Sequence, residues 1–89
     1  MRLKGKIVLI TGGSRGIGFA IEKTLSENGA SVVITSKNSE KLNIAKSKIS
    51  NSFGITCDIK KTNEVKNVVD ETIKKFGRLD ILVNNAGIF

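Results

Sequence analysis

Apolar runs alternate with helical patterns along the whole sequence. Four short runs rich in Val and Ile, typical of strands buried on both faces, are separated by three segments with apolar residues every three or four positions. Strands joined by helices pair in parallel, because each connection crosses the sheet before the next strand begins. The order β-α-β-α-β-α-β therefore predicts an α/β chain built on a parallel sheet.

The four expected strands are short and evenly spaced. We place them at Lys6–Thr11, Ser31–Ser36, Phe53–Cys57 and Leu79–Asn84. The third is the weakest of the four, because Gly54 lies inside it and glycine weakens a strand. The apolar run Ile81–Val83 predicts that the last strand is buried on both faces.

Three helices are expected between these strands. The first ends at Asn28-Gly29, the second is capped by Asn38 or Ser39 and runs to about Ile49, and Gly77 ends the third. Each helix should turn an apolar stripe toward the sheet. The stripes comprise Ile17, Ala20, Ile21, Thr24 and Leu25 in the first helix, Leu42, Ala45 and Ile49 in the second, and Val65, Val68, Val69, Thr72, Ile73 and Phe76 in the third.

Right-handed crossovers with helices on both faces generate a Rossmann-type, doubly wound sheet. The expected strand order is 3-2-1-4, with the first two helices on one face and the third on the other. With 89 residues the chain has room for one small domain at most. We therefore expect a single partial domain over residues 1–89.

Composition narrows the possible functions. The net charge of +7 comes from 15 basic residues that lie mostly on outward helix faces among Glu and Asp, and the only aromatics are four Phe, which disfavours nucleic-acid binding. Cys57 is the single cysteine and His is absent, so we expect no disulfide and no metal site. The sequence has no export signal or membrane span, and we expect a cytoplasmic protein.

A glycine loop, Thr11–Gly18, lies between the first strand and the first helix with Gly-x-x-x-Gly-x-Gly spacing. Gly12 permits a tight turn, Gly16 lets backbone N–H groups approach a pyrophosphate, and Gly18 lets the helix pack closely on the strand. Glycines after a strand also occur in methyltransferases and in plain turns. A P-loop is excluded because no Gly-Lys-Ser or Gly-Lys-Thr closes the motif. In this β-α-β context the loop predicts dinucleotide binding.

The end of the second strand indicates which dinucleotide is bound. An NAD site normally has Asp or Glu about 20 residues past the glycine loop, where the carboxylate binds the ribose. This chain has Thr35-Ser36-Lys37-Asn38 there, and Lys37 with Arg15 could hold the 2′-phosphate of NADP. The sequence thus predicts NADP in preference to NAD, although both cations could also be plain surface charges.

Gly5-Lys6 before the first strand and Phe76–Asp80 before the fourth resemble ketoacyl-reductase-like members of the short-chain dehydrogenase/reductase family. Three motifs together carry the resemblance to the family as a whole. They are TGGSRGIG at Thr11–Gly18, Asp58 after the third strand, and NNAG at Asn84–Gly87. The resemblance covers the whole chain. It implies that the Asp58 carboxylate accepts from the adenine amino group beside the Ile59 backbone, that Asn84 braces the sheet, and that residues 85–87 approach the ribose. The alternative for Asp58 is that it caps the following helix.

The resemblance also implies hydride transfer between NADP(H) and a small-molecule carbonyl or alcohol. The expected cofactor-binding residues are Gly12, Ser14, Arg15, Gly16, Ile17, Gly18, Ser36, Lys37, Asp58, Ile59, Asn85, Ala86 and Gly87.

In that family a Ser, a Tyr and a Lys carry the chemistry, and they come after NNAG. This sequence contains no Tyr, so we assign no catalytic residue and expect the N-terminal part of a longer enzyme. The alternative is a non-catalytic nucleotide-binding module or pseudo-enzyme. The open edge of the last strand predicts self-association of the chain.

Overall fold

The computed structural model describes residues 2–11, 16–58 and 60–84, and all seven expected elements form in the expected order. The strands are β1 (Ile7–Thr11), β2 (Ser31–Ser36), β3 (Ser52–Thr56) and β4 (Ile81–Asn84), and the helices are α1 (Gly16–Glu27), α2 (Ser39–Lys48) and α3 (Thr62–Phe76). The main differences in strand bounds are that β3 begins one residue earlier than predicted and β4 begins two residues later. No helix in these ranges is both long and apolar enough to cross a membrane.

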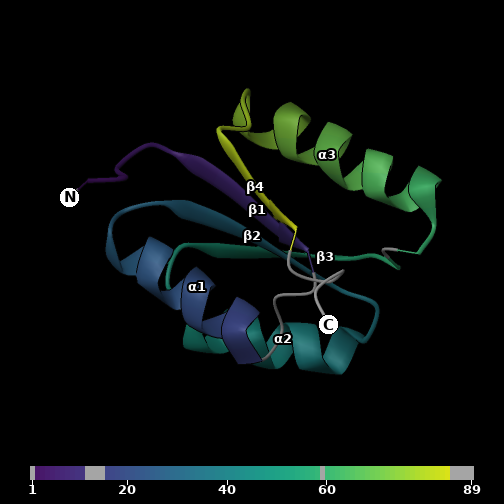
Figure 1. The fold of residues 1–89 in the computed structure, drawn as a ribbon, viewed down its shortest axis with the longest axis horizontal. Helices are drawn as coiled ribbons and strands as arrows, with labels where there is room; N and C mark the ends of the chain where they lie inside the picture. Colours follow the sequence, from purple (N-terminus) through teal and green to yellow (C-terminus); the bar gives the residue numbers. More distant parts are fainter. Residues whose placement is uncertain (1, 12–15, 59, 85–89) are drawn as a thin grey trace.

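The four strands form one parallel sheet in the order β3-β2-β1-β4, as predicted. In register, Val8 of the central strand β1 is aligned with Val32 of β2 and Ile81 of β4. Figure 1 shows α1 and α2 on one face of the sheet and α3 on the other. The Rossmann-type arrangement expected from the sequence is therefore confirmed.

Each face of the sheet has its own apolar cluster, because successive side chains of a strand point to opposite faces. In β1, Val8 and Ile10 belong to the cluster beneath α1 and α2, whereas Leu9 belongs to the cluster beneath α3. The predicted sheet-facing stripe of α2 is confirmed, since all three of its members are buried: Leu42, Ala45 and Ile49.

Local sequence explains where two of the helices begin or end. Asn38 is the N-cap of α2, and its Oδ1 accepts from the Lys41 N–H at 2.9 Å. Gly77 ends α3 in the left-handed conformation with φ 81°, where glycine carries no steric cost. Both termini confirm the prediction, and Asn38 rather than Ser39 is the cap.

The predicted core-facing stripe of α1 is only partly correct: Ile21 and Leu25 are half-buried and pack against the cluster beneath α1 and α2. Ala20 and Thr24 are exposed, and with Ile21 and Leu25 they line a shallow surface hollow of about 330 Å³. The side of α1 that meets the sheet also contains the fully buried Glu22, and Gly18 one turn earlier is buried as well. An apolar pattern could not include Glu22 in this face, because glutamate is a charged residue type.

The prediction that β4 is buried on both faces is also wrong at Leu82, which is 55% exposed. Leu82 is aligned with Leu9, so it lies on the α3 face, but β4 has only one neighbouring strand among the described residues. An edge strand receives less cover than a central one.

Asp80, the residue before β4, is hydrogen-bonded to Ile7 at the start of β1. Asp80 Oδ2 accepts from the Ile7 N–H at 2.8 Å, and the Asp80 N–H donates to the Ile7 carbonyl at 3.0 Å. The hydrogen bonds from the Arg78 guanidinium and from Ile7 hold the pKa of Asp80 below its usual range. These bonds fix the register of β4 against β1.

Candidate dinucleotide-binding site

The carboxyl ends of the four parallel strands meet along one edge of the sheet. Thr11 at the end of β1 is aligned with Asn84 at the end of β4. The hydroxyl of Thr35 in β2 donates to the Ile10 carbonyl at 3.3 Å, and the hydroxyl of Thr11 donates to the Val83 carbonyl at 3.5 Å. Side chains therefore reinforce the strand pairing at the edge where ligands bind in sheets of this type.

Helix α1 begins at this edge. Its first residue, Gly16, follows the end of β1 at Thr11 by five positions, and the first N–H groups of a helix have no partner within the helix. Those donors and the partial positive charge of the helix end favour an anion. Gly16 and Ile17 open α1, and burial of Gly18 agrees with the predicted close packing of α1 on the sheet. The predicted residues Gly12, Ser14 and Arg15 lie outside the described ranges.

The end of β2 presents a hydroxyl and a cation. Ser36 is half-buried, and its Oγ accepts from the Asn38 N–H at 3.2 Å, which leaves the hydroxyl hydrogen for another acceptor. Lys37 is exposed. Neither Lys37 nor Asn38 is acidic, so no carboxylate directly follows the strand. This donor set fits a phosphate group on the ribose.

The turn after β3 holds Asp58 through both its backbone and its side chain. The Asp58 N–H donates to Glu64 Oε1 at 2.9 Å, Asp58 Oδ1 accepts from the Lys60 N–H at 3.0 Å, and the Asp58 carbonyl accepts from the Lys61 N–H at 3.0 Å. The N-cap of α3 is Lys61, three residues later, so the interpretation of Asp58 as the helix cap is wrong. Its predicted neighbour Ile59 lies outside the described ranges.

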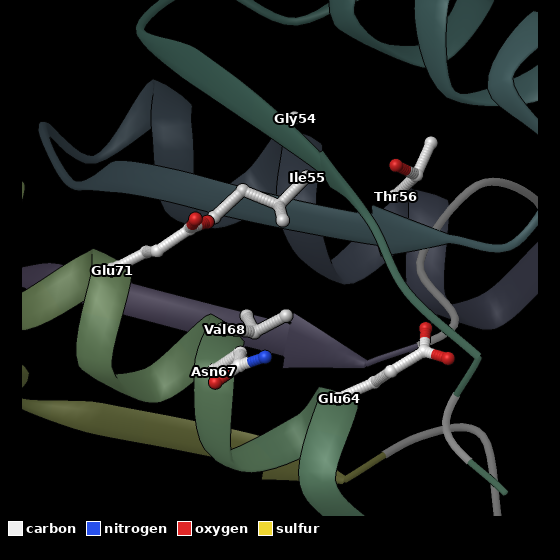
Figure 2. A pocket seen from close by; sticks show the side chains of 7 residues that line it. All are labelled: Gly54, Ile55, Thr56, Glu64, Asn67, Val68 and Glu71. Carbon is white, nitrogen blue, oxygen red and sulfur yellow. The ribbon is translucent and has the colours of Figure 1, made fainter. Parts of the chain in front are cut away.

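Sequence analysis did not identify Glu64 as part of this edge. It is the third residue of α3, a position from which a glutamate commonly reaches back to the backbone before the helix. Figure 2 shows its side chain extending from α3 toward the chain that leaves β3. Burial raises the pKa of the Cys57 thiol there, and the carboxylates of Glu64 and Asp58 raise it further.

A pocket of about 500 Å³ separates β3 from α3 on the same side of the sheet (Figure 2). It is lined by Gly54, Ile55, Thr56, Glu64, Asn67, Val68 and Glu71. At the last strand, Asn84 ends β4, and the predicted residues Asn85, Ala86 and Gly87 lie outside the described ranges.

A parallel 3-2-1-4 sheet with a helix N-terminus and polar side chains at its carboxyl edge defines a Rossmann-type nucleotide-binding fold. The family model described as short chain dehydrogenase matches residues 6–89. The chain belongs to this family of oxidoreductases, as the sequence motifs indicated.

Relatives and solved structures agree with this assignment. Bovine (Bos taurus) L-fucose dehydrogenase is 42% identical over 86 residues, which are 97% of this chain and 32% of that protein. The chain thus spans about a third of this relative's length. The crystal structure of an actinorhodin polyketide ketoreductase variant with NADPH matches with a TM-score of 0.88 and 30% identity, covering 93% of this chain and 33% of that one. The 3-ketoacyl-(acyl-carrier-protein) reductase from Brucella melitensis, complexed with NADH, matches with a TM-score of 0.88 and 37% identity, covering 97% and 36%.

Proposed function

We propose that this chain is the NADP(H)-binding part of an oxidoreductase that transfers hydride between NADP(H) and a small carbonyl or alcohol substrate. The single observation that carries the choice of NADP(H) is the end of β2, where the Ser36 hydroxyl and the exposed Lys37 are followed by no carboxylate. A carboxylate at this position would repel the 2′-phosphate, whereas a cation and a hydroxyl attract it. The solved relatives include an NADPH complex and an NADH complex, so the choice rests on this chain's own residues.

In this proposal each strand end holds a different part of the cofactor. The first turn of α1 offers N–H donors to the pyrophosphate, with the glycine loop approaching it closely. Ser36 and Lys37, with Arg15, bind the 2′-phosphate, and Asp58 accepts from the adenine amino group beside Ile59. The NNAG segment brings backbone close to the ribose.

The hydride itself is supplied by the reduced nicotinamide of the bound cofactor. The residues described here bind and orient the adenosine half, so they determine which cofactor is held and in what position. Binding of the adenosine half helps to place the reacting carbon of the nicotinamide, because a cofactor that is held at both ends can adopt fewer orientations.

Titration calorimetry on the whole protein with NADPH and NADH tests the proposal. We expect NADPH to bind more tightly, by roughly tenfold or more, because charge-assisted hydrogen bonds to the 2′-phosphate are worth about 1.5–3 kcal/mol. Lys37→Asp should narrow or reverse this preference, since it replaces the cation with a carboxylate that accepts from the ribose of NADH. The same change at an exposed lysine of α3, Lys66→Asp, provides a charge-matched control and should leave the preference intact.

Equal affinities of the unaltered protein for the two cofactors would contradict the choice of NADP(H). Absence of binding to either cofactor would contradict the proposed function as a whole.

A further inference from the structure

We propose that Glu64 is a positioning residue for the adenine of the cofactor, which it controls by holding the backbone of Asp58. This inference rests on the proposed function, because it assumes that Asp58 meets the adenine amino group. Glu64 itself would not touch the cofactor. It is a new specificity element located on α3, outside the three motifs that point to the family.

The contact that carries the inference is the 2.9 Å hydrogen bond from the Asp58 N–H to Glu64 Oε1. A glutamate at the third position of a helix commonly accepts from the N-cap residue. Here the N-cap is Lys61, and Glu64 reaches past it to a residue three positions earlier. The side chain therefore acts on the turn after β3 rather than on the helix end alone.

The second observation is the state of the Asp58 carboxylate. Oδ1 accepts from the Lys60 N–H at 3.0 Å, which fixes the plane of the carboxylate within the turn. No described residue donates to Oδ2, and Asp58 is only half-buried. A carboxylate oxygen accepts two hydrogen bonds, so Oδ2 can take the N–H of an exocyclic amine.

The third observation connects this turn to the corner expected to hold the 2′-phosphate. The Cys57 N–H donates to the Ser36 carbonyl at 3.0 Å, so the end of β2 and the residue before Asp58 are held together directly. Glu64 fixes the far side of the same turn. It is itself held by Lys61, whose Nζ lies 3.6 Å from Glu64 Oε2. The residues expected to bind adenine and those expected to bind the 2′-phosphate are thus connected by hydrogen bonds.

Two properties of Glu64 must be separated by experiment: its charge and its reach. The charge alone would favour the N-terminus of α3, an effect that would concern the stability of the fold. The reach, meaning the length of the side chain, is what allows Glu64 to accept the hydrogen bond from the Asp58 N–H. Glu64→Gln keeps the reach and an acceptor oxygen but removes the charge, whereas Glu64→Asp keeps the charge but is one methylene too short.

We therefore compare both variants with the unaltered whole protein by titration calorimetry. The probes are NADPH and its hypoxanthine analogue, in which a carbonyl oxygen replaces the adenine amino group. If Glu64 positions Asp58, Glu64→Asp should weaken NADPH binding by roughly tenfold, the effect of about one lost hydrogen bond to a charged group. Glu64→Gln should bind NADPH as the unaltered protein does, and neither variant should change binding of the analogue.

Glu71 provides the matched control. It lies two turns further along α3 and lines the same pocket (Figure 2), but no hydrogen bond links it to the described residues of the turn after β3. Glu71→Asp should leave the affinity for both probes unchanged. Thermal unfolding of each variant, recorded alongside, shows whether any loss of affinity follows from a loss of folded protein.

Three outcomes would overturn the inference. A Glu64→Asp variant that binds NADPH normally would show that reach is irrelevant. Equal weakening toward NADPH and the hypoxanthine analogue would show a structural role without adenine selectivity. If the unaltered protein binds both probes equally, Asp58 does not contact the adenine amino group. If it binds no dinucleotide, the proposed function itself is wrong.

Discussion

The two faces of the sheet each bury one polar side chain from a helix, and they do so in opposite ways. On the α3 face, Thr72 is buried and its hydroxyl donates to the Val68 carbonyl at 2.7 Å. On the other face, Glu22 of α1 is buried and neither of its carboxylate oxygens has a partner among the described residues. Burial raises the pKa of Glu22 to about 8.

The surroundings of Glu22 explain its pKa. Helix α1 packs on β1 and β2, and neither strand contains a titratable side chain. A carboxyl group without a partner in such a setting keeps its proton, because the neutral form is less costly to bury than the charged one. The hydroxyl of Thr72 needs no partner from outside its own helix. The buried polar group of α1 therefore titrates near neutral pH, whereas Thr72 in α3 does not titrate.

The largest expected effect comes from Glu22→Met, which replaces the buried acid with an unbranched apolar side chain. Between the ordinary pKa of 4.5 and about 8, the unfolded chain releases a proton that the folded chain keeps. The free energy of unfolding should therefore fall as the pH rises, by about 1.4 kcal/mol per pH unit. Glu22→Met removes this loss and should stabilise the protein by about 4 kcal/mol near pH 8 and by much less near pH 5.

Urea unfolding at several pH values measures this slope. Glu27→Met, at an exposed position of the same helix, is the control and should leave the slope unchanged. If the unaltered protein and Glu22→Met show parallel stability curves between pH 5 and pH 8, Glu22 is ionised in the folded state and the comparison between the two faces fails.

A smaller effect is expected from Thr72→Val on the other face. Valine has nearly the shape of threonine and the same branching at Cβ, and the Val68 carbonyl loses only the extra bond from the hydroxyl. We expect a change of less than about 1 kcal/mol in the free energy of unfolding, equal at pH 5 and pH 8. A loss above about 2 kcal/mol, or a difference from the unaltered protein that changes between pH 5 and pH 8 in urea unfolding, would show that this face is not self-sufficient.

The smallest effect on stability is expected at the β4 edge, where the readout is association. Leu82 is 55% exposed beside an unpaired strand edge, so we expect the 89-residue chain to self-associate there. Leu82→Glu should shift sedimentation toward the monomer and hardly change unfolding. Ile44→Glu replaces an equally exposed residue, also 55%, in α2 on the opposite face and should not alter association. A monomeric unaltered chain would refute the prediction.

The buried face of a helix could be predicted from the sequence where apolar residues form it. It could not be predicted where a charged residue is part of it. The stripe of α3 gave the correct face except at Ile73, which is 45% exposed, because its centre, Val68 and Thr72, is buried against one sheet. In α1 the stripe is only partly correct: Ala20 and Thr24 are exposed, and the fully buried residue is Glu22. Periodicity measures hydrophobicity alone, so it cannot place a buried acid.

The candidate site shows the same division. The location of Ser36, Lys37 and Asp58 at the carboxyl edge could be predicted, because it follows from the ends of strands in a parallel sheet, whereas their role in binding stays a prediction. The bond between Glu64 and Asp58 could not, since it depends on how the turn before α3 folds back on the helix. The spacing of residues in the sequence does not reveal the conformation of that turn.

The bond between Ile7 and Asp80 also sets an order of events during synthesis, because it joins residues 73 positions apart. Strand β1 can pair with β2 soon after β2 has been made, but its other edge stays open until β4 has been made. At about 5–20 residues per second, synthesis of those 73 residues takes roughly 4–15 s. Throughout that interval the nascent chain carries a half-paired apolar strand, which makes β1 a segment that cellular chaperones would be expected to bind.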